Sequence, residues 1–112
     1  MNDLNRFEQA ESSYRKAVQL KPYQAEFYNN LGNLFKALQS FERAEYCLRK
    51  AILLKVDFVE AHSNLGNTLR ENGRLGEAEK RYKRAIAFAP DYFEAYYNLG
   101  VAVSEMGNLG EA

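Results

Sequence analysis

The sequence is poor in the residues that build metal, redox and disulfide sites. It contains one cysteine, one histidine, two prolines and no tryptophan. A single cysteine excludes an intrachain disulfide framework and a paired-thiol zinc site. The 15 basic and 15 acidic residues balance and are interspersed, whereas a nucleic-acid-binding chain normally carries a basic face. We therefore predict no metal, no cofactor and no nucleic-acid partner.

Long hydrophobic runs are also missing. No apolar stretch approaches the roughly 18 residues that a membrane span requires. The first residues do not follow the pattern of a secretory signal, in which a charged segment precedes an apolar one. We predict no membrane partner, and an intracellular, cytoplasmic location is the expectation.

What the sequence does contain is a repeat. Asn-Leu-Gly occurs at 30–32, 64–66 and 98–100, and successive copies are 34 residues apart. Alanines keep the same period in two series, one at 10, 44, 78 and 112 and the other at 17, 51 and 85. A fixed period of roughly 20–50 residues marks an array of stacked repeats rather than a single globule.

Within each repeat the apolar residues predict two helices. Residues Tyr28, Leu31 and Phe35 share one helical stripe, and Leu48 with Ala51 belongs to a second. Gly32 and Ala44 are small because the two helices are expected to approach closely there, and a larger side chain would overpack the contact. Such a pair buries its stripes only against its neighbours, so stability is shared along the array.

Glycine and proline mark the ends of these helices. Gly73-Arg74 and Gly107-Asn108 are predicted to form the turn between the two helices of a pair, and Gln39 holds the same position one repeat earlier. Pro22 and Pro90 are predicted to end the second helix of a pair.

These landmarks resemble the tetratricopeptide repeat family. The residues that carry the resemblance are Ala-Tyr-Tyr-Asn-Leu-Gly at 95–100 and the segment from Gly73 to Pro90. Departures are mild: Tyr28, His62 and Tyr96 fill a bulky core position often held by tryptophan. The resemblance implies an all-α fold, an α-solenoid in which antiparallel helix pairs form a right-handed superhelix.

The period divides the chain into a partial first repeat at 1–24, full repeats at 25–58 and 59–92, and a partial last repeat at 93–112. Residues 1–4 are expected to be the last turn of a first helix, followed by a second helix over about 6–20. Ala112 is expected to lie where another second helix begins. Either the chain is a fragment of a longer array, or its uncapped ends associate head-to-tail with other copies.

The first helix of each repeat carries a polar stripe opposite its core stripe. Asparagine recurs in it, although asparagine is a mediocre helix former and these positions are not caps. An amide offers both a donor and an acceptor, which suits an extended peptide backbone. The resemblance implies that first helices line a concave groove, which makes this stripe the candidate binding face. The candidate residues are Asn30, Asn33, Lys36, Asn64, Asn67, Arg70, Tyr97 and Asn98.

Two alternatives bear on that face. Asn30, Asn64 and Asn98 can equally be a framework feature that bonds to a neighbouring repeat. Tetratricopeptide co-chaperones grip a terminal carboxylate with basic residues, but the matching positions here hold Asn29 or Ser63, then Glu94 and Asn98. A carboxylate clamp is therefore not expected. Acidic residues at 26, 60 and 94 favour a ligand that contains lysine or arginine.

No residues point to catalysis. His62 occupies a core position and is interpreted as a packing residue, and Cys47 is expected to be a partly exposed thiol with no imidazole beside it. The leading hypothesis is a non-enzymatic scaffold that binds a peptide or partner protein. One alternative is the substrate-recruiting arm of a larger enzyme, because Asn-Leu-Gly-Asn at 30–33 and 64–67 is similar to the superhelix of protein O-linked N-acetylglucosamine transferases. Another is self-assembly through the open ends.

Overall fold

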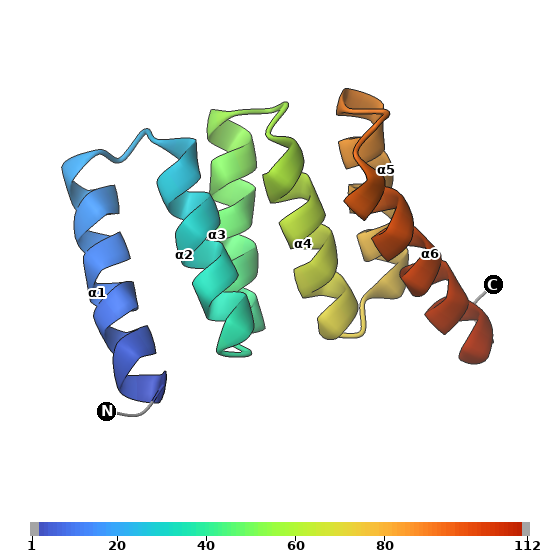
Figure 1. Ribbon diagram of the computed structural model, residues 1–112, viewed down its shortest axis with the longest axis horizontal. Coiled ribbons are helices and arrows are strands. Elements are labelled where there is room, and N and C mark those ends of the chain that lie inside the picture. The colour runs from blue at the N-terminus through green and yellow to red at the C-terminus, as the bar shows by residue number, and fades with distance from the viewer. Residues whose placement is uncertain (1–2, 111–112) are drawn as a thin grey trace. The chain divides into compact units, whose positions relative to one another are not determined.

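The computed structural model describes residues 3–110, which contain helices and no strand. The helices are α1 (Asp3–Leu20), α2 (Ala25–Ala37), α3 (Phe41–Leu54), α4 (Val59–Glu71), α5 (Leu75–Phe88) and α6 (Phe93–Asn108) (Figure 1). The prediction of an all-α chain built from helix pairs is confirmed. The chain divides into two compact units, Met1–Val56 and Asp57–Ala112.

In the first unit, α2 packs against both α1 and α3, and α2 and α3 run antiparallel (Figure 1). Its core cluster joins Leu31 and Phe35 of α2 to Ala44 and Cys47 of α3. Tyr14 and Val18 of α1 pack against this cluster. The apolar stripe of α2 is thus buried between two other helices, as the periodic pattern requires.

In the second unit, α4 and α5 form the corresponding antiparallel pair, and α6 packs on α5 and also touches α4 (Figure 1). Leu65, Tyr82 and Ala85 have no exposed surface, and Leu69 is 1% exposed. Tyr82 is among the largest side chains that are fully buried, so the interior of this unit is arranged around its ring.

The repeated glycines mark a close contact between the helices of a pair, as predicted. A Cβ atom placed on Gly32 would lie 2.8 Å from Leu48 Cγ, and one placed on Gly66 would lie 2.6 Å from Tyr82 Cε1. These distances are shorter than carbon atoms can approach without a shift of the structure. Gly100 holds the same repeat position, but nothing lies within 4 Å of its Cβ position. The contact therefore depends on a second helix packing against the first.

The turns between paired helices use a left-handed residue. Gly73 has φ = 82°, and Gln39 has φ = 61° at the equivalent position. Each turn is closed by a backbone hydrogen bond, from Ser40 N to Phe35 O at 2.9 Å and from Arg74 N to Leu69 O at 2.8 Å. Glycine adopts this conformation without a steric penalty, whereas Gln39 adopts it with a Cβ atom present.

Two predicted boundaries are wrong. Residues 3–4 do not end a separate first helix, because α1 begins at Asp3 and no glycine or proline breaks it before Leu20. Gly107 does not form a turn, because α6 continues through it to Asn108 and the positive φ occurs at Gly110. A single glycine costs a helix only about 1 kcal/mol. The second helix expected from Ala112 lies outside the described residues.

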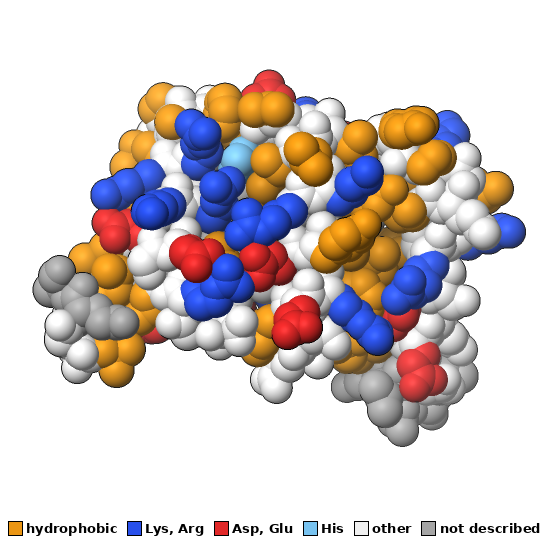
Figure 2. All heavy atoms as spheres, turned by 180° about the vertical axis from the view of Figure 1, so that it is seen from behind, with side chains coloured by type: hydrophobic (Ala, Val, Ile, Leu, Met, Phe, Trp, Pro, Cys, Tyr) orange, Lys and Arg blue, Asp and Glu red, His pale blue; other side chains and the backbone are white. Residues whose placement is uncertain are grey.

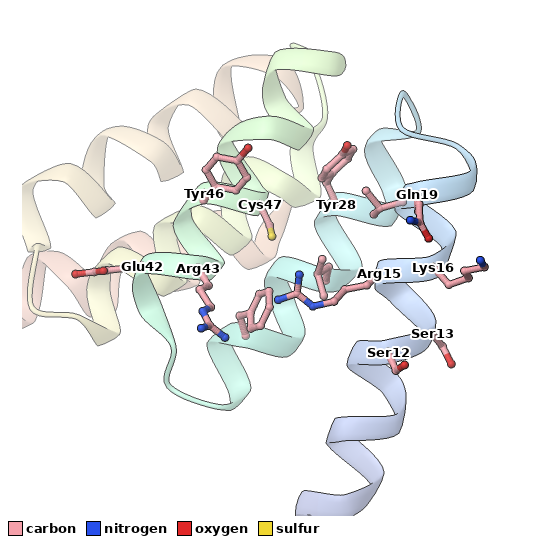
Figure 3. Close-up of a pocket in the computed structure, with 13 residues that line it drawn as sticks. Ser12, Ser13, Arg15, Lys16, Gln19, Tyr28, Glu42, Arg43, Tyr46 and Cys47 are labelled. Atoms are coloured by element: carbon pink, nitrogen blue, oxygen red, sulfur yellow. The ribbon is translucent and has the colours of Figure 1, made fainter.

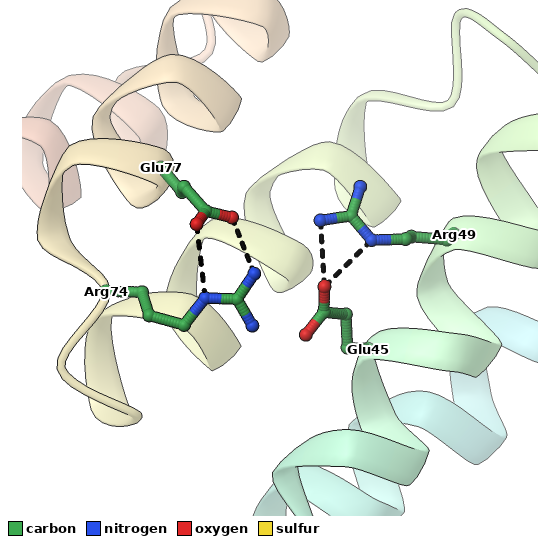
Figure 4. A network of polar contacts seen from close by, with 4 residues as sticks. All are labelled: Glu45, Arg49, Arg74 and Glu77. Carbon is green, nitrogen blue, oxygen red and sulfur yellow. Dashed lines mark hydrogen bonds and ion pairs between the residues drawn. The ribbon is translucent and has the colours of Figure 1, made fainter.

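Ion pairs on the second helices follow the same period. Arg15 bonds Glu11 at 2.8 Å and Arg49 bonds Glu45 at 2.8 Å, one turn apart within α1 and α3. Lys83 and Glu79 repeat the arrangement in α5 at 2.9 Å. Figure 4 shows the Glu45–Arg49 pair and a further pair, Arg74 with Glu77 at 2.6 Å. Exposed pairs of this kind contribute about 0.3–0.5 kcal/mol each and account for these charges without a ligand.

None of the helices that the structure describes combines the length and the apolar character needed to cross a membrane.

Candidate functional site

The polar stripe of α4 is part of a hydrogen-bonded network that links three helices. The Tyr82 hydroxyl of α5 donates to Asn67 Oδ1 of α4 at 2.6 Å. Arg70 Nε, also on α4, donates to the Tyr82 oxygen at 3.3 Å, and Arg70 Nη1 lies 3.6 Å from Glu105 Oε1 of α6. We call Asn67, Tyr82, Arg70 and Glu105 the Asn67 network. It holds two of the candidate residues in fixed orientations.

The pKa shifts within the Asn67 network agree with this geometry. Burial raises the pKa of Tyr82, and the neighbouring Arg70 only partly opposes that shift. Burial would lower the pKa of Arg70, but its hydrogen bond to Tyr82 and the charge of Glu105 outweigh burial, so the Arg70 pKa is raised. At neutral pH the network therefore consists of a neutral phenol and a guanidinium ion.

The hydrogen bond to Tyr82 fixes the orientation of the Asn67 amide. Because Asn67 Oδ1 accepts this hydrogen bond, the amide is held in one orientation, which leaves its N–H donors and the second lone pair of Oδ1 for other contacts. In the first unit Leu48 occupies the repeat position of Tyr82, and Asn33 makes no side-chain hydrogen bond to another described residue. Asn67 is thus a pre-organised donor, whereas the Asn33 amide can rotate.

Two carboxylates, one in the first turn of α4 and one in the first turn of α6, act on Tyr92. Burial is the main cause that raises the pKa of Tyr92, and the negative charges of Glu94 and Glu60 raise it further. A hydrogen bond with Ser63 partly opposes the shift. Both glutamates are exposed, so they place negative potential at the end of the α4 and α6 stripes. This is the acidic feature that the sequence predicted.

Helix energetics supply a second reason for these acids. A glutamate stands in the first turn of α2, α4 and α6, but also of α3 and α5, which carry no candidate site. Carboxylates near a helix N-terminus are stabilising by about 0.3–1 kcal/mol. Their recurrence alone is therefore not evidence of a ligand, and what singles out Glu60 and Glu94 is that both act on Tyr92.

In the first unit the candidate residues lie on α2. Asn30 and Asn33 are exposed, and together with Phe7 and Tyr14 of α1 they line a hollow of about 310 Å³. Lys36, the third candidate on α2, is half-buried. The two asparagines thus lie beside the aromatic side chains of α1.

On α6, Tyr97 is 73% exposed and Asn98 is half-buried. Tyr97 lines a hollow of about 470 Å³ with Val101, Glu105 and other α6 residues. Tyr96 was expected on the core side, but it is 49% exposed. Its hydroxyl still donates to Pro90 O at 2.8 Å, as the Tyr28 hydroxyl does to Pro22 O at 2.9 Å. The reason for the exposure is that no described helix covers this side of α6.

Two residues outside the predicted site set complete the arrangement. Tyr82 and Glu105 orient Asn67 and Arg70. The repeat position of Tyr82 holds Tyr14 and Leu48 in the other repeats, so it predicts a core side chain and does not reveal a hydrogen-bonded hydroxyl. One signal was available in the sequence. Of these three residues, Tyr82 alone combines a hydroxyl with a glycine and an arginine, Gly66 and Arg70, on the first helix of its own pair.

The remaining chemical candidates are buried. His62 is 2% exposed and its ring lies 5.5 Å from that of Phe88, which confirms it as a packing residue. Cys47 was expected to be partly exposed, but it is 5% exposed because its position faces the α2 stripe and joins the core cluster. Within the described residues no three His, Cys, Asp or Glu side chains are grouped as metal ligands.

Burial makes a measurable prediction for Cys47. It raises the thiol pKa from 9.0 to about 11, and the charge of Arg15 opposes this only in part. At pH 8 roughly a thousandth of the thiol is then ionised, and only the thiolate reacts. We expect Ellman's reagent to modify the folded protein very slowly, with a rate that still rises between pH 9 and pH 10. The same protein in guanidinium chloride should react at once, and equal rates in the two states would contradict the buried position.

The sequence patterns of two protein families match segments of the chain. Residues 2–39 and 66–107 match the family described as TPR repeat. Residues 25–55 match the family described as Tetratricopeptide repeat. No protein with a curated description matches the chain.

Several solved structures are similar to this one. The first TPR of Spaghetti (RPAP3), bound to the HSP90 peptide SRMEEVD, shares 25% identity over 93% of this chain and 82% of that chain, with a TM-score of 0.87. The TPR domain of Arabidopsis OM64 shares 26% identity over 88% and 81%, with a TM-score of 0.82. MamA shares 28% identity over 97% of this chain and 64% of that chain, with a TM-score of 0.85.

Proposed function

Because the chain belongs to the tetratricopeptide repeat family, we propose that it is a non-catalytic protein-interaction module that binds extended peptides on the polar faces of its first helices. The observation that carries the proposal is the Asn67 network, which fixes an amide on the polar stripe of α4 and pairs the neighbouring Arg70 charge with Glu105. The similar TPR of Spaghetti (RPAP3) was solved with a bound peptide, which supports the same class of function here.

The ligand chemistry follows from the charges on the face of the second unit. Glu60 and Glu94 lie at one end of the face, and the exposed ring of Tyr97 lies on α6. A peptide with lysine or arginine side chains would pair with the two carboxylates, while its backbone would bond the amides of Asn64, Asn67 and Asn98. Exposed aromatic residues are frequent energetic centres of interfaces, which assigns Tyr97 to an apolar side chain of the peptide.

This ligand differs in charge from the peptide of the similar complex. The HSP90 peptide SRMEEVD is acidic at its end, and two carboxylates would repel such a sequence. The Arg70 guanidinium is engaged by Tyr82 and Glu105, so it does not offset that repulsion. We therefore propose a basic peptide as the ligand of the α4 and α6 faces.

The test uses a short fluorescein-labelled peptide in which lysines alternate with leucines, followed by anisotropy. Replacing both Asn64 and Asn67 with alanine should weaken binding about tenfold, since each amide bond contributes about 0.5–1.5 kcal/mol. Asn72→Ala is the matched control, because Asn72 is exposed at the end of α4 and outside the face. Circular dichroism should show that all variants keep their helices.

The charge requirement is tested with the same peptide. Glu60→Gln combined with Glu94→Gln should also weaken binding, and added salt should remove the difference by screening the exposed carboxylates. If the asparagine variants bind as well as the parent protein, or if a glutamine-for-lysine peptide binds equally, the proposed face is wrong.

A further inference from the structure

A cleft lies in the first unit, on the side of α2 that carries its apolar stripe. Its volume is about 1070 Å³, and α1, α2 and α3 all contribute to its walls (Figure 3). The α2 residues in it are Tyr28, Leu31 and Phe35, which lie opposite Asn30 and Asn33 around the helix. This α1–α3 cleft is therefore separate from the face proposed above for peptide binding.

The floor of the α1–α3 cleft is an aromatic ring between two guanidinium groups. Arg15 of α1 lies 5.5 Å from the centre of the Phe35 ring, and Arg43 of α3 lies 5.8 Å from it. Figure 3 shows Arg15 and Arg43 among the side chains that line the cleft. Phe35 itself is only 3% exposed, so the two arginines hold their charges against a buried apolar floor. Both arginines are themselves exposed, so their guanidinium groups are accessible to a ligand.

The charge in the cleft is mainly positive. Arg15, Lys16 and Arg43 line it together with one acid, Glu42. Arg15 is paired with Glu11 through its Nε atom. Lys16 and Arg43 form no ion pair with any residue in 3–110. On the face shown in Figure 2, lysine and arginine side chains stand among hydrophobic ones.

Arg43 is not part of the repeat pattern. The residues at the same repeat position are Gln9 and Glu77, and Glu77 pairs with Arg74, the residue that precedes α5. Lys16, by contrast, has basic equivalents at Lys50 and Arg84. The period explains a basic residue at position 16, whereas helix energetics favour an acid near the start of a helix such as α3. A cation at 43 thus needs another reason.

We propose that the α1–α3 cleft binds an acidic peptide segment, distinct from the basic ligand of the α4 and α6 faces. Carboxylates of the segment pair with Lys16 and Arg43, and an apolar side chain packs beside Tyr46, which is 71% exposed at the rim. The cleft is much larger than one phosphate or carboxylate group requires, and its apolar lining fits a side chain that accompanies the charges. Arginine is suited to this role because its guanidinium binds a carboxylate through two hydrogen bonds.

The experiment uses the whole chain and two labelled peptides, one in which glutamates alternate with leucines and one with glutamine at every glutamate. The glutamate peptide should bind measurably and the glutamine peptide should not. Arg43→Gln should weaken binding of the glutamate peptide about tenfold, because one charge-assisted bond contributes at least that factor. Lys16→Gln should weaken it by a smaller factor, since the lysine ammonium cannot form the two parallel hydrogen bonds to a carboxylate that arginine forms.

Lys50→Gln is the matched control, because Lys50 holds the repeat position of Lys16 but does not line the cleft. It should leave the affinity unchanged, as should Asn64→Ala with Asn67→Ala. Amide chemical shifts should move around Phe35 and Cys47 and not around Asn67. These readouts separate the cleft from the face proposed above, so either proposal can fail without the other.

Several results would overturn the acidic-peptide site. They are equal binding of the glutamine peptide, an equal loss in Lys16→Gln and Lys50→Gln, and chemical-shift changes centred on α4 and α6. Displacement of the peptide by inorganic phosphate alone would assign the cleft to a small anion instead. Displacement by single-stranded RNA at lower concentration than by unlabelled peptide would assign it to nucleic acid.

Discussion

Replacing Tyr82 with alanine is expected to lower the free energy of unfolding by about 3–5 kcal/mol, the range for removing a large aromatic ring from a core. Tyr82 has no exposed surface, and its ring fills the space above Gly66. The change also removes the hydroxyl that bonds Asn67 and Arg70. Guanidinium unfolding followed by circular dichroism measures the loss.

Tyr82→Phe separates the ring from the hydroxyl. It keeps the packing and removes only the hydrogen bonds, so we expect a loss of about 0.5–1.5 kcal/mol. The Asn67 amide should then rotate freely, and affinity for the lysine peptide should fall while the helices remain. If Tyr82→Ala is no more destabilising than Tyr82→Phe, the ring does not organise this core.

Replacing Gly66 with alanine is expected to lower the free energy of unfolding by about 1–3 kcal/mol, the usual cost of overpacking. The new methyl group would lie 2.6–3.0 Å from three atoms of the Tyr82 ring. That ring has no exposed surface and is held by Asn67 through its hydroxyl, so it cannot move aside cheaply. Thermal unfolding followed by circular dichroism is the measurement.

Gly100→Ala is the matched control, because it makes the same change at the same repeat position. Nothing lies within 4 Å of the added methyl group there, so only the better helix propensity of alanine remains, and stability should rise by about 0.5–1 kcal/mol. In a Tyr82→Ala background the penalty at Gly66 should disappear. Equal effects at Gly66 and Gly100 would contradict the close contact.

Much of the fold could be predicted because each feature recurs in several repeats, so that a departure in one copy does not hide the pattern. The recurrence of Asn-Leu-Gly and of alanine at fixed spacing identifies the helices, their buried stripes and the glycine contacts. Each of these depends on residues within one pair of helices, so a local pattern is sufficient. Gln39 shows the strength of the pattern, since its position adopts the left-handed turn of Gly73 despite its side chain.

The predictions that failed were those made for one residue from the residues at the same position in other repeats. Cys47 was judged from Ser13 and Arg81 at its repeat position, but its own surroundings are the apolar groups of α1 and α2. The turn predicted at Gly107 followed from Gly73, but α6 continues past Gly107. The burial predicted for Tyr96 followed from Tyr28, but no described helix covers Tyr96. A repeat position predicts burial only where the neighbouring element is present.

The proposed binding faces were also only partly predictable from the sequence. The sequence placed asparagines on one stripe of each first helix, and helix geometry alone puts them on the same side. It did not reveal that Tyr82 fixes Asn67 or that Arg15 and Arg43 both lie beside the Phe35 ring. Each of those arrangements joins residues from different helices, and side-chain direction across a helix contact is not a function of spacing along the chain.

By itself the sequence determined the helices, their pairing and the small residues at their contacts, because hydrophobic periodicity and glycine geometry act over a few turns of chain. Only the tertiary structure decided which polar groups are held in place and which charges share a cleft. Hydrogen bonds and charge pairs act over a few ångströms, so they depend on how the helices pack and not on the order of residues within any one of them.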